Sequence, residues 1–182
     1  MDMHAVLTEA KCDKMKLTII LTLTNCVLLF LMIFAATVFM PYRGLVKNFP
    51  KDVQERLIPR LDEIDKKPKT PRIIGSIVVI LLCFAFMAVF VTGFIDGKNN
   101  VFSFGEQFIR SIIIAFGVKA FDIIGLDLIL ITKTHFFQHF FPETEGCAGW
   151  KQFGYNRMQH LKQIICMIVL CGVFSFIFST FS

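Results

Sequence analysis

The chain has 182 residues, of which 55% are hydrophobic and 22 are phenylalanine, and its formal net charge is +5. With a mean hydropathy of +0.65, a domain of this length has too little interior to hide its apolar side chains from water, which excludes an ordinary soluble protein. We expect an all-α, polytopic membrane protein with a single membrane domain, built as an antiparallel four-helix transmembrane bundle.

Four apolar windows support this expectation, because about 20 apolar residues are enough to cross a bilayer as a helix. The windows lie at residues 17–40, 73–95, 111–132 and 161–181. The first is longer than the roughly 7–15 apolar residues of a signal peptide, so we interpret it as a retained span. Together they occupy about half of the chain, which leaves no room for a second globular domain.

The connection between the first two windows, residues 41–72, is predicted to contain an amphipathic helix. Asp52 is placed to cap this helix. Apolar residues then recur at helical spacing, at Val53, Leu57, Leu61 and Ile64. This apolar face either covers the protein's own core, which we favour, or lies on lipid headgroups or a partner protein.

A tight turn is predicted at residues 96–100, so the second and third spans are expected to be antiparallel neighbours. Ser103 and Glu106 fit the S-x-x-E capping box, which predicts that the third helix begins at Phe104 and extends over residues 104–132. Glu106 and Arg110 are four residues apart on this helix, and we expect them to pair at the membrane surface.

The third window carries three charged residues, Lys119, Asp122 and Asp127. A charge at the centre of a bilayer costs about 2.5–3.5 kcal/mol even on the most permissive scale, so such residues indicate a function. Lys119 and Asp122 are three residues apart and share one helix face, where they can form an ion pair. This pair either fixes the packing of the helices or belongs to a cation or proton site.

Asp127 has apolar neighbours on its own helix, and in an α-helix it lies about 140° around the axis from Asp122. We therefore expect that one partner cannot serve both carboxylates. The four windows offer polar partners for Asp127 but no base: Asn25, Ser76, Thr92 and Ser175. The sequence thus predicts that Asp127 faces a water-filled cavity open to the cytoplasm.

Histidine and glutamate residues gather after the third window. His135 and His139 are four residues apart and can share a metal ion on a helix, with Glu143, Glu145 or His160 as a further ligand. The aromatic residues around the two histidines fit an interfacial position without metal equally well. The two glutamates are candidates for acid–base chemistry near the bilayer surface, or for capping the next segment.

Basic residues predict the orientation in the cell membrane. Residues 41–72 and 133–162 lie on one side and hold thirteen lysines and arginines, against five on the other side. The positive-inside rule places these two connections in the cytoplasm and both termini outside. Attraction to lipid headgroups explains this charge, so the expected partner is the bilayer and no nucleic acid.

Several short motifs resemble an uncharacterised family of small four-span bacterial membrane proteins. They are P-K-D-V-Q-E-R at residues 50–56, Asp122-x4-Asp127, Thr132-Lys133, and P-E-T-E at residues 142–145, where the family more often has P-G-T-E. The resemblance covers most of residues 50–160. It implies a four-span fold and a common role for these positions, but no activity.

The leading functional hypothesis is a small transporter, channel or transport-accessory subunit with its polar site at Lys119, Asp122 and Asp127. Four spans enclose little by themselves, so we expect a homo-oligomer or a subunit of a larger membrane complex. The chain has no P-loop, so it does not itself drive transport with a nucleotide. One alternative is a scaffold that holds a partner with residues 50–67. Another is a membrane-embedded enzyme acting on a lipid-like substrate at the cytoplasmic face, through His135, His139, Glu143 and Glu145. The sequence identifies no cofactor.

Overall fold

The computed structural model describes residues 3–39, 43–65 and 70–180, and all the regular structure in these ranges is helical. Three helical stretches are long and apolar enough to cross a membrane, at Asp13–Phe39, Arg72–Asn99 and Arg157–Thr180. These findings confirm the predicted all-helical class and fit a membrane protein. The third predicted window is divided between two helical elements of 17 and 13 residues, each shorter than a full span.

The helices follow the apolar windows but extend beyond most of them. The elements in chain order are α1 (Met3–Phe39), α2 (Arg43–Val46), α3 (Lys51–Asp65), α4 (Thr70–Asn99), α5 (Phe104–Ala120), the π-helix η1 (Phe121–Lys133), α6 (Phe136–Phe140), the 3-10 helices η2 (Pro142–Thr144) and η3 (Ala148–Lys151), and α7 (Arg157–Thr180).

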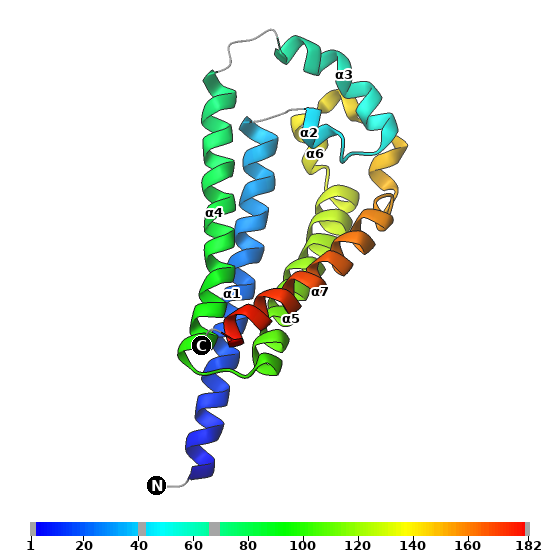
Figure 1. Cartoon of the computed structure of the whole chain (residues 1–182). Helices are drawn as coiled ribbons and strands as arrows, with labels where there is room; N and C mark the ends of the chain where they lie inside the picture. Colours follow the sequence, from blue (N-terminus) through cyan, green and yellow to red (C-terminus); the bar gives the residue numbers. More distant parts are fainter. Residues whose placement is uncertain (1–2, 40–42, 66–69, 181–182) are drawn as a thin grey trace.

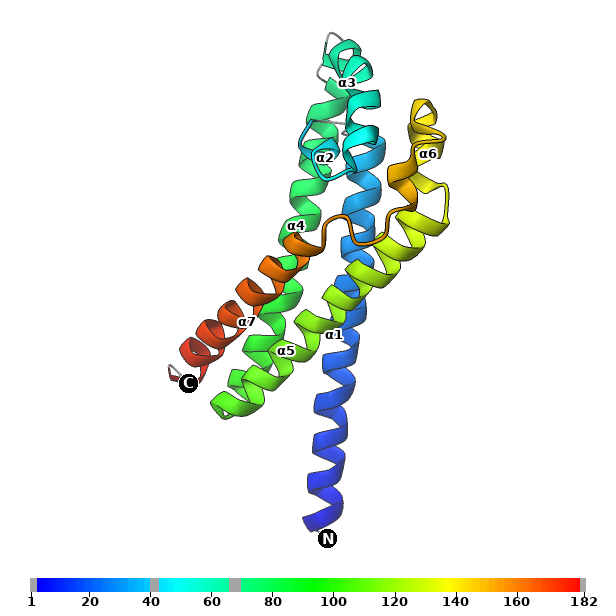
Figure 2. The same ribbon diagram turned by 90° about the vertical axis from the view of Figure 1, so that its right-hand side faces the viewer.

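The long helices form an elongated bundle. Figure 1 shows α1 and α4 side by side, with the continuous α5–η1 helix and α7 tilted across them. Helix α5 packs against α1 and α7, and α4 also contacts α7. In both views α1 begins and α7 ends at the end of the bundle opposite α3 (Figure 2).

One end of the bundle carries a small head, made of α2, α3, α6, η2 and η3 (Figure 1). Its core is aromatic: the Phe137 ring lies 5.0 Å from that of Phe49 and 5.6 Å from that of Trp150, centroid to centroid. The inner face of α3 packs on this core through the buried residues Val53, Leu57 and Leu61. The interpretation that this face covers the protein's own core is confirmed for these three, whereas the side chain of Ile64 lies outside the described residues.

Helix α5 begins at Phe104, as the capping box predicts. The Ser103 hydroxyl accepts a hydrogen bond from the Glu106 backbone amide, and the Glu106 carboxylate accepts one from the Ser103 amide at 2.9 Å. The predicted pair between Glu106 and Arg110 is wrong. Arg110 turns inward instead and forms an ion pair of 2.6 Å with Asp96 at the end of α4.

Candidate functional site

A cluster of six polar side chains joins the α5–η1 helix to the beginning of α7, on the side of the head. We call these residues the polar cluster: Lys119 from α5, Asp122 and Asp127 from η1, Asn156 before α7, and His160 and Gln163 from α7. Lys119 and Asp127 are each only 8% exposed. The third and fourth predicted spans thus bring their polar groups together here.

The Lys119 ammonium has three hydrogen-bond acceptors around it. Its Nζ atom lies 2.6 Å from Asp122 Oδ2, 2.6 Å from Gln163 Oε1 and 2.7 Å from His160 Nδ1. An ammonium has three N–H donors and no acceptor, so these contacts satisfy it fully. The predicted ion pair of Lys119 with Asp122 is present, and it is one part of a larger network.

His160 connects this ammonium to Asp127. Its Nε2 atom lies 2.6 Å from Asp127 Oδ2, which also accepts a hydrogen bond of 3.1 Å from Asn156 Nδ2. Since Nδ1 of the ring faces the Lys119 ammonium, which only donates, Nδ1 is the acceptor and Nε2 carries the proton. The result is an unbroken hydrogen-bonded chain from Lys119 through His160 to Asp127.

The expected separation of Asp122 and Asp127 around the helix is wrong, because the helix is not an α-helix at this point, but the two carboxylates still have different hydrogen-bond partners, Lys119 for Asp122 and His160 for Asp127. Residues Phe121–Lys133 form a π-helix, in which hydrogen bonds join residues five apart. Asp122 and Asp127 are five residues apart and therefore lie on nearly the same face. His160 faces both, with Nδ1 at 3.7 Å from Asp122 Oδ2.

Sequence reasoning missed His160, Asn156 and Gln163 as partners. Asn156 and His160 precede the fourth apolar window, because α7 begins at Arg157, about one turn ahead of it, and Gln163 lies in the first turn of the window itself. A signal was present, because residues 156, 160 and 163 are spaced to share one face of a helix. A polar stripe leading into an apolar span is the pattern that indicates them.

Two cavities lie beside the polar cluster. The inner cavity, of about 200 Å³, is lined by Asp122, Asp127 and His160 together with residues of α1 and the head. The outer cavity, of about 630 Å³, is lined by residues of the head and of the segment before α7, including Lys47 and Lys51. The two cavities adjoin, because they share the lining residues Asn48, Phe49, Tyr155, Asn156 and Gln159.

Tyr155 lines both cavities. Its hydroxyl donates a hydrogen bond of 2.6 Å to the Asn48 carbonyl, which ties the segment before α7 to the head. Burial raises the pKa of Tyr155 above its usual value, and the charges of Asp127 and Asp122 raise it further. The hydroxyl therefore stays protonated and keeps donating across the neutral range.

The other predicted site residues lie in the head. Glu143 pairs with Arg60 of α3 at 2.7 Å, and Glu145 is exposed. His135 precedes α6, and the ring of His139 packs on Phe140. In the part of the chain that the structure describes, no group of three or more His, Cys, Asp or Glu residues is placed to hold a metal ion.

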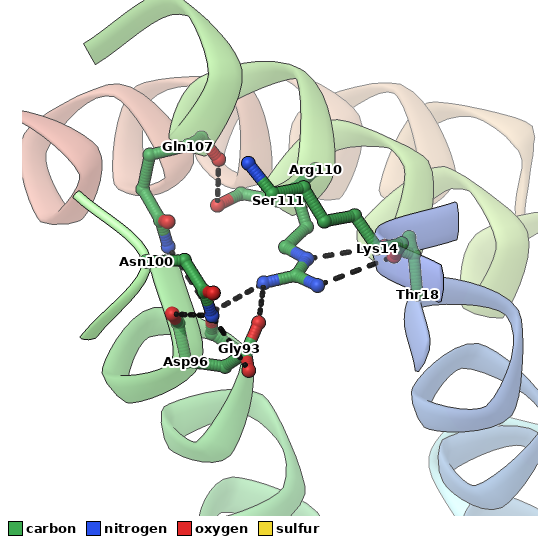
Figure 3. A network of polar contacts seen from close by, with 8 residues as sticks. All are labelled: Lys14, Thr18, Gly93, Asp96, Asn100, Gln107, Arg110 and Ser111. Carbon is green, nitrogen blue, oxygen red and sulfur yellow. Dashed lines mark hydrogen bonds and ion pairs between the residues drawn. The ribbon is translucent and has the colours of Figure 1, made fainter. Parts of the chain in front are cut away.

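A second buried network lies towards the opposite end of the bundle, around Arg110 (Figure 3). Besides its ion pair with Asp96, the Arg110 guanidinium donates to Thr18 Oγ1 at 3.1 Å and to the carbonyls of Gly93 and Lys14. Arg110 is 4% exposed. It thus fastens α5 to α1 and α4 at one point.

Comparisons of the chain with protein-family models, curated proteins and solved structures gave no match. The resemblance to a four-span bacterial family therefore stays a prediction, and the functional argument rests on the geometry of the site.

Proposed function

We propose that the chain is a small membrane transport protein, either a transporter or channel itself or an accessory subunit of one, and that the polar cluster is its working site. The observation that carries the proposal is the position of Asp127. Its carboxylate is buried and bonded to His160, yet it lines a cavity that adjoins a larger one at the head. A buried carboxylate beside a polar cavity is a site that protons or cations can reach.

The buried oxygen of Asn156 supports the same proposal. Asn156 Oδ1 has no hydrogen-bond partner among the residues that the structure describes, and this side chain lines both cavities. A buried acceptor without a donor raises the free energy of the folded protein. This oxygen therefore favours a ligand that donates a hydrogen bond or carries positive charge. Water, a hydrated proton and a cation all meet this requirement.

Access from the head side is favoured over access from the opposite end. Between Arg110 and Lys119, helix α5 buries the apolar residues Ile114, Ala115 and Val118. Beyond them the Arg110 network holds α1, α4 and α5 together (Figure 3). A route across the membrane therefore requires this end to open, as alternating access does.

The proposed arrangement is four membrane spans, with the α5–η1 helix as the third. This helix runs from the end of the bundle opposite the head to the head itself (Figures 1 and 2). The thirteen basic residues of the connections at residues 41–72 and 133–162 favour a cytoplasmic head and both termini outside, in the cell membrane. Assembly with further copies or with other membrane subunits belongs to the same proposal, since one thin bundle encloses little.

The geometry favours transport over the two alternatives. The enzyme hypothesis relies on Glu143, which is held by Arg60, and on Glu145 and the two histidines His135 and His139, which lie in the head outside the polar cluster. The scaffold hypothesis relies on the apolar face of α3, which packs on the head's own core.

Flux of protons or monovalent cations into proteoliposomes tests the proposal. We expect wild-type protein to carry such a flux and Asp127→Asn to abolish it, since the amide cannot take up a proton or balance a cation. Glu145→Gln is the matched control, because it removes an exposed carboxylate of the head, and it should behave like the wild type. Equal flux through wild-type protein and Asp127→Asn would contradict the proposal.

A further inference from the structure

We infer that Lys119, His160 and Asp127 form a proton relay, in which His160 passes protons between the carboxylate beside the cavity and the buried ammonium. The inference rests on the proposed function and deepens it, because it names the proton as the ion coupled to transport. The chain of contacts that carries it is short at both steps: 2.7 Å from Lys119 Nζ to His160 Nδ1, and 2.6 Å from His160 Nε2 to Asp127 Oδ2.

The direction of each hydrogen bond follows from the donors available. Lys119 places its other two N–H groups on Asp122 and Gln163, both at 2.6 Å, so the third points at His160. The imidazole is then neutral, with a free electron pair on Nδ1 and a proton on Nε2. This is the tautomer in which a histidine accepts a proton on one side while it gives one up on the other.

One transfer step balances without any further reactant. The Nζ–H bond of Lys119 breaks and its proton bonds to Nδ1, while the Nε2–H bond breaks and its proton bonds to Asp127 Oδ2. The products are a neutral amine, the other neutral tautomer of His160 and a protonated carboxyl group. The total charge of the three residues is unchanged, while two opposite charges disappear from a poorly solvated site, where charges are costly.

In the reverse direction, the relay takes up a proton from the cavity. A proton taken up by Asp127 passes to Nε2, the Nδ1 proton passes to the neutral amine, and Lys119 becomes an ammonium. Asp127 is the end of the relay that lines the cavity, and Lys119 is the end next to the apolar stretch of α5. The relay therefore moves a proton between the inner cavity and the buried amine of Lys119.

The groups that face His160 come from three elements. Lys119 belongs to α5, Asp122 and Asp127 belong to η1, and Tyr155 lies ahead of α7 on the wall of the inner cavity. The residues that α1, α2 and the segment before α3 contribute to that wall, Ile33, Leu45, Asn48 and Phe49, do not titrate. The titratable groups that face His160 are thus the two carboxylates, the lysine and the phenol of Tyr155.

A purely structural role for His160 is separated from a relay by His160→Gln. A glutamine offers a carbonyl oxygen to Lys119 and an N–H donor to Asp127, so it can keep both hydrogen bonds, but it cannot carry a proton. The matched control is His139→Gln, because His139 is exposed in the head. Gel filtration and the melting temperature of each variant establish that it is folded.

The experiment has two readouts on full-length protein. In proteoliposomes we expect His160→Gln to lower the proton flux about 100-fold, the scale of a lost proton-transfer group, and His139→Gln to leave it unchanged. In nanodiscs, nitrogen-15 spectra of labelled histidine should show His160, identified by its absence in His160→Gln, as the Nε2–H tautomer near neutral pH.

The outcomes distinguish the relay from the proposed function. A folded His160→Gln protein that transports protons at the wild-type rate overturns the relay, while the wild-type flux still supports the transport proposal. Wild-type protein without any flux overturns the transport proposal. In that case the spectra decide on the relay alone: a His160 ring that carries a proton on Nδ1 near neutral pH has no free electron pair facing Lys119, and this result overturns the relay.

Discussion

Tyr155 gives a pH test of the contact between the head and the membrane helices. Its pKa in the folded protein is raised above the usual value of 10.0, mainly by burial and then by Asp127 and Asp122. Above about pH 10 the unfolded chain loses this proton while the folded protein keeps it, so stability falls as pH rises. Below that pH both states are protonated and the effect vanishes.

We therefore expect the melting temperature of the wild type to fall more steeply between about pH 9 and about pH 11 than that of Tyr155→Phe. At neutral pH the variant should be less stable by about 0.5–1.5 kcal/mol, because it lacks the hydrogen bond to Asn48. Thermal unfolding in detergent, followed by circular dichroism, measures both effects. Parallel pH curves for the two proteins would show that Tyr155 is ionised equally in both states.

Part of the site is predictable from single residues. Lys119, Asp122 and Asp127 stand out because a charge inside an apolar window is costly, and the sequence therefore indicates them directly. His160 does not stand out, because it precedes its window, and only the fold brings it against Asp127. Arg110 was expected to pair with the nearest carboxylate along its helix, but burial against α4 favours Asp96 instead.

Substitutions in helix α3 test how this helix packs on the core of the head. Leu57 is fully buried in the aromatic core of the head, whereas its neighbour Ile58 is 45% exposed. We expect Leu57→Ala to lower the free energy of unfolding by about 2–5 kcal/mol, the usual result of emptying a buried leucine site. Ile58→Ala should change it by less than about 0.5 kcal/mol. Chemical unfolding in mixed micelles measures both, and equal effects would contradict the described packing.

The helices differ in how well a sequence pattern predicts them. Apolar runs predict α1, α4 and α7 because the bilayer selects apolar residues on every face, and spaced apolar residues predict the inner face of α3. The capping box predicts the start of α5. No sequence pattern predicts the change to a π-helix at Phe121, because an α-helix and a π-helix in a membrane use the same apolar residue types.

The topology is a property of the whole molecule. With four spans, Val101, which is 81% exposed between α4 and α5, lies outside, and the exposed Glu145 of the head lies in the cytoplasm. In a background without the six native cysteines, an impermeant maleimide should label Val101→Cys on intact cells. Glu145→Cys should be labelled only after the membrane is opened. Labelling of both positions from one side would exclude a third span between them.

We propose that the molecule is open at the head and closed at the opposite end. Cavities reach the polar cluster from the head, while buried apolar residues and the Arg110 network close the other end (Figure 3). The sequence predicts the cavity at Asp127 from the absence of a basic partner in the windows. It does not predict His160, which satisfies the carboxylate while leaving it on the cavity wall.

Reaction of Asp127→Cys with a small, charged thiol reagent tests most directly whether water reaches this position from the head. The thiol reacts as a thiolate, which forms only where water is present. In vesicles of known orientation, we predict that the cysteine reacts from the cytoplasmic side, at least about tenfold faster than Ile129→Cys on the exposed apolar surface of η1. A cysteine at position 127 that is as inert as the one at position 129, or that reacts only from the outside, would contradict the account.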